Sequence, residues 1–84
     1  MNDNLAVSDQ LLTVMRRVLK DPRLVWSREL SSWDVPAWDS ITNAQLLVEV
    51  EESFELRFST PEVLALKCAG DLLDLIMSKS RGAN

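Results

Sequence analysis

The sequence predicts an all-α protein, a small bundle of three main helices and one short helix, with a long ordered loop between the first two. Apolar residues recur at helical spacing in three segments, N-capping residues and proline mark helix starts, and no stretch alternates as a strand does. With 84 residues, 46% of them hydrophobic, the chain can build one small core and no second domain. We therefore expect a single domain over residues 1–84, ordered from about residue 8 to residue 79, with flexible termini.

The first helix is expected from about Ser8 to Leu19. Ser8 can serve as its N-cap, and basic residues near the C-terminal end suit the helix dipole. Asp21 and Pro22 end it. Its core-facing residues recur at helical spacing: Leu11, Leu12, Met15, Val18 and Leu19.

The segment from Asp21 to Trp38 shows no sustained periodicity, and a loop of this length is uncommon in a small domain. It is nevertheless rich in apolar residues, which predicts an ordered loop laid across the bundle. We expect Trp26 and Trp33 to anchor this loop, because large aromatic side chains bury much area. A turn of helix is expected around residues 27–30.

The second helix is expected from Asp39 or Ser40 to about Phe54 and has the clearest pattern. Its apolar stripe consists of Ile41, Leu46, Leu47, Val50 and Phe54. Its polar side carries Gln45, Glu49, Glu52 and Glu55. Ala44 and Val48 lie between the two sides, so they form either the edge of the core or a small apolar patch for a partner.

Two further helices are expected in the C-terminal third. Thr60 as cap followed by Pro61 begins a short helix that ends near Leu66. The last helix spans about residues 69–79. Its core face is formed by Leu72, Leu73, Leu75 and Ile76.

Negative charge is concentrated in the middle of the chain. The formal net charge is −4, and no Lys or Arg lies between Arg28 and Arg57. That interval contains the acids Glu29, Asp34, Asp39, Glu49, Glu51, Glu52 and Glu55. Such a surface disfavours nucleic acid, which requires clustered basic groups. It favours proteins with basic surfaces, through electrostatic steering.

Several classes of function are excluded by residue content. One cysteine, Cys68, cannot form an internal disulfide, and without histidine no zinc site is expected. No nucleophile with a paired base can be assembled either, so we expect no catalytic residues and no enzyme. The sequence shows neither a signal peptide nor an apolar run of the length that spans a bilayer, so a cytoplasmic location is expected.

The residues Trp38-Asp39-Ser40-Ile41 mark the start of the second helix. A helix start offers unpaired backbone N–H groups and a positive dipole end, so a phosphate carried on Ser40 would be favourably placed. The simpler interpretation is that Ser40 only caps the helix. Asp39 can also cap it.

Five stretches carry a family resemblance: Asp39-Ser40-Ile41, Leu46-Leu47, residues 50–56, residues 64–67 and residues 70–76. Together they resemble the acyl carrier protein family over nearly the whole chain, and Asp39-Ser40-Ile41 looks like its Asp-Ser-Leu attachment motif. The long loop before the serine is what this family requires. The resemblance therefore implies an acyl-carrier-like helical bundle.

The resemblance also implies a function. Ser40 receives the phosphopantetheine arm of coenzyme A from a phosphopantetheinyl transferase. The arm holds acyl or aminoacyl groups as thioesters for loading ligases and downstream synthases or transferases of fatty acid, polyketide or other specialised biosynthesis. Transferase and partner recognition are assigned to Asp39, Ile41, Ala44, Gln45, Val48, Glu49 and Glu52. Trp38 is a candidate contact for the arm or a partner, and a monomer is expected.

Departures from the family pattern leave alternatives open. Trp38 stands where carriers of fatty acid synthesis often have a small or polar residue, which favours a free-standing carrier of a specialised pathway. Gln45 replaces an acid expected on the side of the helix that faces partners. Within the carrier class, an aminoacyl, peptidyl or D-alanyl carrier is an alternative. Outside it, the alternative is an acidic helical interaction module with no prosthetic group.

Overall fold

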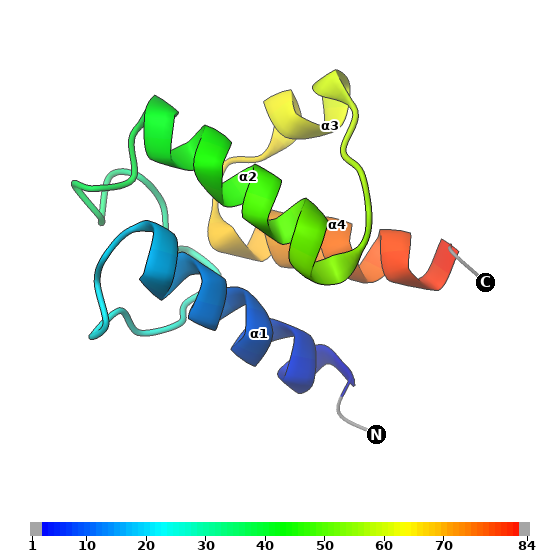
Figure 1. Ribbon diagram of the computed structural model, residues 1–84, viewed down its shortest axis with the longest axis horizontal. Helices are drawn as coiled ribbons and strands as arrows, with labels where there is room; N and C mark the ends of the chain where they lie inside the picture. The colour runs from blue at the N-terminus through cyan, green and yellow to red at the C-terminus, as the bar shows by residue number, and fades with distance from the viewer. Residues whose placement is uncertain (1–2, 83–84) are drawn as a thin grey trace.

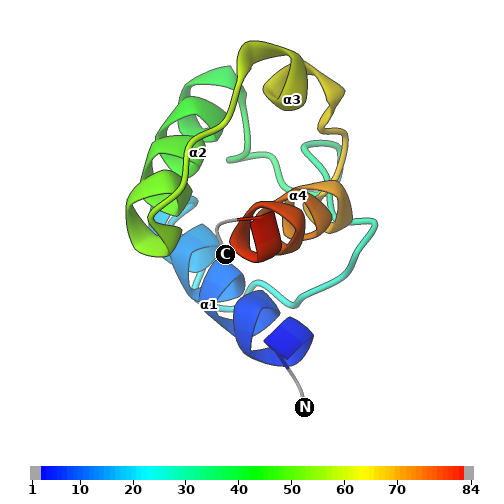
Figure 2. The same cartoon turned by 90° about the vertical axis from the view of Figure 1, so that its right-hand side faces the viewer.

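The computed structural model describes residues 3–82, which form four helices: α1 (Asp3–Val18), α2 (Ser40–Phe54), α3 (Thr60–Ala65) and α4 (Ala69–Gly82). The long helices α1, α2 and α4 form the body of the molecule, with α1 packed against both others. The short α3 lies on the side of the bundle away from α1 in both views (Figures 1 and 2). The predicted all-α bundle of three main helices and one short helix is confirmed.

The core is built from one side of each long helix and from the loop between α1 and α2. The described buried apolar side chains are Leu11, Val14, Met15, Leu19, Leu24, Val35, Trp38, Leu46, Leu47, Val50, Ala69, Leu72, Leu73 and Ile76. Burial of these side chains is the main favourable contribution to folding. Because the core draws on the loop as well as the helices, the loop is a structural part of the bundle.

Main-chain and side-chain contacts fix this loop against α1 and α4. The N–H of Ala69 donates to the Leu30 carbonyl at 2.8 Å, and the Arg28 guanidinium pairs with Asp74 of α4 at 2.6 Å. On the other side, Arg16 Nε of α1 donates to the Leu24 carbonyl at 2.9 Å. The prediction of an ordered loop therefore holds.

Gly70 permits the loop backbone to approach the start of α4 closely. Its N–H donates to the Arg28 carbonyl at 2.9 Å, so the loop backbone lies directly on the start of α4. A Cβ at this position would come within 2.9 Å of that carbonyl oxygen and 3.0 Å of the Arg28 Cβ. Glycine is needed here for close packing of two backbones.

Of the two tryptophans predicted to anchor the loop, one packs against the core and the other is exposed. Trp26 packs partly buried against the core, as expected. Trp33 is 95% exposed, so its prediction as an anchor is wrong. It lies in a tight turn closed by the N–H of Asp34 donating to the Ser31 carbonyl at 3.0 Å, and this turn directs the indole outward. Residues 27–30 form a single hydrogen-bonded turn and not the predicted turn of helix, with the Leu30 N–H bonded to the Ser27 carbonyl at 3.2 Å.

Helix α2 has the predicted bounds, whereas α1 and α4 are longer than predicted. Helix α1 begins at Asp3, so Ser8 lies within it, 8% exposed, and is not its N-cap. Leu5 and Ala6 favour helix, which explains the extension. Helix α4 continues to Gly82. Flexibility at residues 1–2 and 83–84 lies outside the described residues.

The cap of α3 is Ser59 and not Thr60. The Ser59 hydroxyl accepts from the Glu62 N–H at 3.3 Å, and the Glu62 carboxylate accepts from the Ser59 N–H at 2.8 Å. This reciprocal pair satisfies two donors at the helix start. Thr60 cannot form it, because the residue three positions after it is Val63.

Candidate functional site

Ser40 is the first residue of α2, and its side chain is exposed. The N-cap is Asp39, whose Oδ1 accepts from the N–H groups of Ile41 at 3.0 Å and Thr42 at 2.9 Å. In return, Thr42 Oγ1 accepts from the Asp39 N–H at 2.8 Å and donates to the Ala37 carbonyl at 2.6 Å. This capping box fixes the turn that presents Ser40.

The Asp39 carboxylate is engaged in hydrogen bonds from the first turn of α2. Hydrogen bonds from the Thr42 N–H, the Thr42 hydroxyl and the Ile41 N–H lower the pKa of Asp39 below its usual value. An ionised carboxylate with this role is a poor general base. The structure thus agrees with Asp39 as a cap, and leaves the Ser40 hydroxyl without an internal activating group among the described residues.

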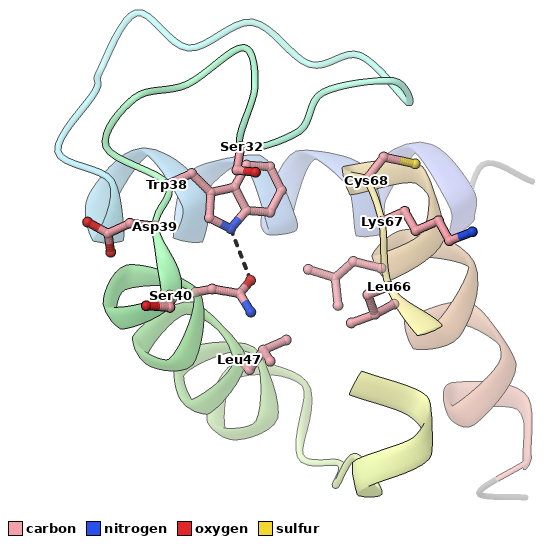
Figure 3. Close-up of a pocket in the computed structure, with 10 residues that line it drawn as sticks. Ser32, Trp38, Asp39, Ser40, Leu47, Leu66, Lys67 and Cys68 are labelled. Carbon is pink, nitrogen blue, oxygen red and sulfur yellow. Dashed lines mark hydrogen bonds between the residues drawn. The ribbon is translucent and has the colours of Figure 1, made fainter. Parts of the chain in front are cut away.

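A cavity of about 250 Å³ opens beside Ser40, between the start of α2, the end of the long loop and the α3–α4 connection (Figure 3). Its polar and rim residues are Ser32, Asp39, Ser40, Asn43, Lys67 and Cys68. Its apolar wall consists of Trp38, Leu47, Leu66 and Leu72. The serine that the sequence singled out therefore stands next to a partly apolar space.

Trp38 forms one wall of this cavity and is only 8% exposed. Its indole Nε1–H donates to Asn43 Oδ1 at 3.0 Å, the bond drawn as a dashed line from Trp38 in Figure 3. Trp38 is therefore poorly placed to contact a protein partner. Of the two roles predicted for it, contact with an arm on Ser40 is the one compatible with its position.

The outer face of α2 is the side turned away from the core. It comprises Ile41, Ala44, Gln45, Val48 and Glu52, all exposed. Ile41 is 70% exposed, so its predicted place in the apolar stripe is wrong. The stripe reduces to Leu46, Leu47 and Val50, with Phe54 partly buried, because the core lies on one side of the helix only. Ala44 and Val48 belong to a surface patch and not to the core edge.

Two other predicted residues have different surroundings. Glu49 is half-buried, and its carboxylate pairs with Arg17 of α1 at 2.6 Å. It is thus already engaged within the bundle, unlike Glu52. Cys68 is a free, partly buried thiol in the cavity wall.

The structure adds residues to the site that the sequence reasoning missed. Thr42 completes the capping box, and Asn43 and Leu66 line the cavity. Asn43 had a usable signal, since it follows Ser40 by three positions and so lies on the same side of a helix. No signal in the sequence indicated Leu66, because only the folding of α3 over α2 brings it near Ser40.

Two negative observations concern the described residues alone. None of their helices has both the length and the apolar character required to cross a membrane. Within the same part of the chain, no three His, Cys, Asp or Glu side chains converge as a metal site.

Comparison with known proteins adds evidence of relationship. No protein-family model and no curated protein sequence matches the chain. Among solved structures, it is similar to the solution NMR structure of a holo acyl carrier protein from Geobacter metallireducens. The two are 35% identical, the match covers 92% of this chain and 88% of the other, and the TM-score is 0.87.

The shared helical bundle and the sequence identity place the chain in the class of carrier proteins, which are not enzymes. At this identity and coverage, the chain belongs to the acyl carrier protein family. The predicted family and the predicted absence of enzymatic activity are both confirmed by this relationship.

Proposed function

We propose that Ser40 carries a phosphopantetheine arm, attached as a phosphodiester by a phosphopantetheinyl transferase. The observation that supports this most is the placement of Ser40. Its exposed side chain is held by a capping box at the start of α2, at the edge of a cavity. When bound, the arm supplies a terminal thiol that holds acyl or aminoacyl groups as thioesters.

The local electrostatics suit a phosphodiester at this position. The Asp39 carboxylate accepts hydrogen bonds from the N–H groups of Ile41 and Thr42, while the N–H of Ser40 has no hydrogen bond within the described structure. That N–H and the positive end of the α2 dipole both favour an anion on Ser40. Asp39 opposes it with its own charge, which favours an arm directed away from the carboxylate.

Partner enzymes are proposed to dock on the outer face of α2. Its apolar residues Ile41, Ala44 and Val48 are exposed in a row that starts beside Ser40, and Glu52 extends the row. An apolar centre with an acidic margin suits an enzyme surface with an apolar contact and basic residues around it. Gln45 belongs to the same surface. Glu49 contributes less, since Arg17 neutralises it.

The proposal also includes the cargo and the pathway. Ligases load acyl or aminoacyl groups onto the arm, and the carrier delivers them to synthases and transferases of fatty acid, polyketide or another specialised biosynthesis. A single monomeric carrier domain over residues 1–84, working in the cytoplasm, also belongs to it. The exposed docking face and the cavity beside Ser40 support a carrier that presents its cargo to separate enzymes.

The test is modification by coenzyme A with a broad-specificity phosphopantetheinyl transferase, read by intact-protein mass. The native chain is expected to gain one arm, and Ser40→Ala none. Ser59→Ala is a matched control, because Ser59 is also an exposed serine at a helix start. It should be modified like the native chain.

A native chain that gains no mass with several transferases contradicts the proposal. It would favour the acidic interaction module without a prosthetic group. In that case Ser40→Ala would keep partner binding, while Glu52→Lys would weaken it.

A further inference from the structure

The side-chain amide of Asn43 has a fixed orientation. The indole N–H of Trp38 can only donate, so the Asn43 atom 3.0 Å from it must be the oxygen Oδ1. The amide nitrogen Nδ2 therefore points away from the indole and carries two N–H donors. Flipping the amide would set two donors against each other and is excluded by this contact.

Asn43 Nδ2 has no hydrogen-bond partner within the described structure, where the Asn43 side chain bonds only through Oδ1. The residue is half-buried, yet no buried side-chain nitrogen or oxygen among the described residues lacks a partner. The Nδ2 atom must therefore be reachable by solvent. Because Asn43 lines the cavity, an unused donor is available at the cavity side of α2.

This donor lies close to the proposed attachment point. Ser40, Asn43 and Leu47 are spaced by three and four residues, so they follow one another along the side of α2 that lines the cavity. Beyond Asn43 the wall is apolar, formed by Leu47, Leu66 and Leu72. Anything tethered to Ser40 that folds into the cavity meets Asn43 before it meets these leucines.

The space is large enough for such a segment. A cavity of about 150 Å³ lined by apolar side chains can bind benzene. The cavity beside Ser40, at about 250 Å³, can hold a short segment of chain. At about 30 Å³ for each water-sized group, this corresponds to roughly eight non-hydrogen atoms.

We propose that Asn43 Nδ2 donates a hydrogen bond to an acceptor oxygen of the chain tethered to Ser40, with Trp38 holding the amide in the required orientation. This inference rests on the proposed attachment at Ser40. The oxygen belongs either to the arm or to the acyl cargo. A plain hydrocarbon placed there would leave the donor desolvated and unpaired, which is unfavourable.

The experiment compares four forms of the chain: unmodified, carrying the bare arm, carrying a hexanoyl arm, and carrying a 3-hydroxyhexanoyl arm. The two acyl forms have the same chain length and differ by one hydroxyl. Proton exchange of the Asn43 side-chain amide and the shift of the Trp38 indole N–H are followed by NMR. Thioester hydrolysis is measured in parallel for the two acyl forms.

The variant Asn43→Asp separates donor from acceptor. Its carboxylate still accepts from the Trp38 indole but offers no N–H, and an acid near a helix start is tolerated. Gln10→Glu is the matched control, since it makes the same amide-to-acid change at an exposed position of α1, away from the cavity and from the outer face of α2. Trp38→Phe removes the indole donor and leaves the Asn43 amide free to rotate.

We expect exchange of the Asn43 amide protons to slow about tenfold in at least one tethered form, the size of effect expected of one hydrogen bond. Slowing with the bare arm places the acceptor in the arm, and slowing only with 3-hydroxyhexanoyl places it in the cargo. In the second case, hydrolysis of the 3-hydroxyhexanoyl thioester is slower than that of the hexanoyl thioester. Asn43→Asp removes this protection against hydrolysis, and Gln10→Glu keeps it.

Unchanged exchange of the Asn43 amide in all three tethered forms overturns the inference and leaves attachment at Ser40 intact. So does an Asn43→Asp variant whose tethered forms behave like those of Gln10→Glu. A chain that gains no arm at all is recognised by its unchanged mass, and it overturns the proposed function itself.

Discussion

The segment from Trp33 to Phe54 has an inner side and an outer side that differ in burial and in the charge around them. The inner side consists of Trp38, Leu46, Leu47 and Val50, all buried in the core. The outer side consists of Trp33, Ile41 and Val48, all exposed, with acidic residues near them. Each side holds a tryptophan and a valine, so the two can be compared with residue type held constant.

This difference shows how one short segment can provide both stability and recognition. The inner side anchors α2 and the end of the loop, so the start of α2 keeps a fixed place. The outer side contributes little to folding, because its apolar atoms remain in water. Exposed apolar residues near Ser40, the proposed attachment point, are better explained by a partner than by packing.

The largest expected effect comes from the tryptophan pair. Trp38→Ala should lower the free energy of unfolding by about 3–5 kcal/mol, since it empties a core position and removes the bond to Asn43. Trp33→Ala should change it by less than about 0.5 kcal/mol. Urea unfolding followed by circular dichroism measures both. Equal losses would break the comparison, and Trp38→Phe gives a milder variant should Trp38→Ala fail to fold.

The valine pair should show the same contrast at smaller scale. Val50 is fully buried and Val48 is 52% exposed, two residues apart on one helix. Val50→Ala should cost about 2 kcal/mol, from two lost methylene equivalents and a small cavity. Val48→Ala should cost less than about 0.5 kcal/mol in unfolding. A Val48→Ala loss as large as that of Val50→Ala would show that the outer side also packs.

Charge reversal on the outer side should affect partners while leaving folding intact. Glu52→Lys is expected to lower the rate of modification by a phosphopantetheinyl transferase about three- to tenfold at low salt, through weaker electrostatic steering. Asp9→Lys is the control, because it makes the same change of charge on an exposed part of α1. Equal slowing by both variants would point to net charge and not to the outer face of α2.

The smallest effect concerns the pH dependence of the α2 cap. Because the folded-state pKa of Asp39 is lowered, its contribution to stability is present above its unfolded pKa, near 4, and is lost as pH falls through the folded pKa. Asparagine also caps helices, so Asp39→Asn should be slightly less stable than the native chain at pH 6, and this difference should shrink as the pH falls below about 4. Asp39→Ala should be less stable at both pH 6 and pH 3. Thermal unfolding across a pH series that starts at pH 6 and continues below pH 3 tests this, and an Asp39→Asn deficit that stays constant over the whole series would contradict it.

Some of the architecture was predictable because it depends on local chemistry. The bounds of α2 followed from helical periodicity after a capping residue, and the core leucines of α4 followed from their spacing. The cap of α3 was misplaced by one residue. Ser59 and Thr60 are both good caps, and only the reciprocal contact with Glu62 distinguishes them.

Burial was harder to predict than helix position. Trp33 and Trp38 both lie in an apolar stretch of sequence, yet a turn at residues 31–34 turns the first outward while the second enters the core. Ile41 was assigned to the apolar stripe, but it lies three and seven positions before the exposed Ala44 and Val48, so it belongs to the outer side of α2 and not to the side of Leu46, Leu47 and Val50. Periodicity identifies a side of a helix, whereas burial also requires another element to cover it.

The sequence by itself determined the helical class, the start of α2 and the serine placed there, because capping and periodicity depend on near neighbours in the chain. Only the tertiary structure decided which apolar residues are covered, that Glu49 is paired with Arg17, and that Asn43 faces a cavity beside Ser40. These facts depend on how α1, the long loop and the α3–α4 connection pack around α2. No local pattern specifies contacts between segments that lie tens of residues apart.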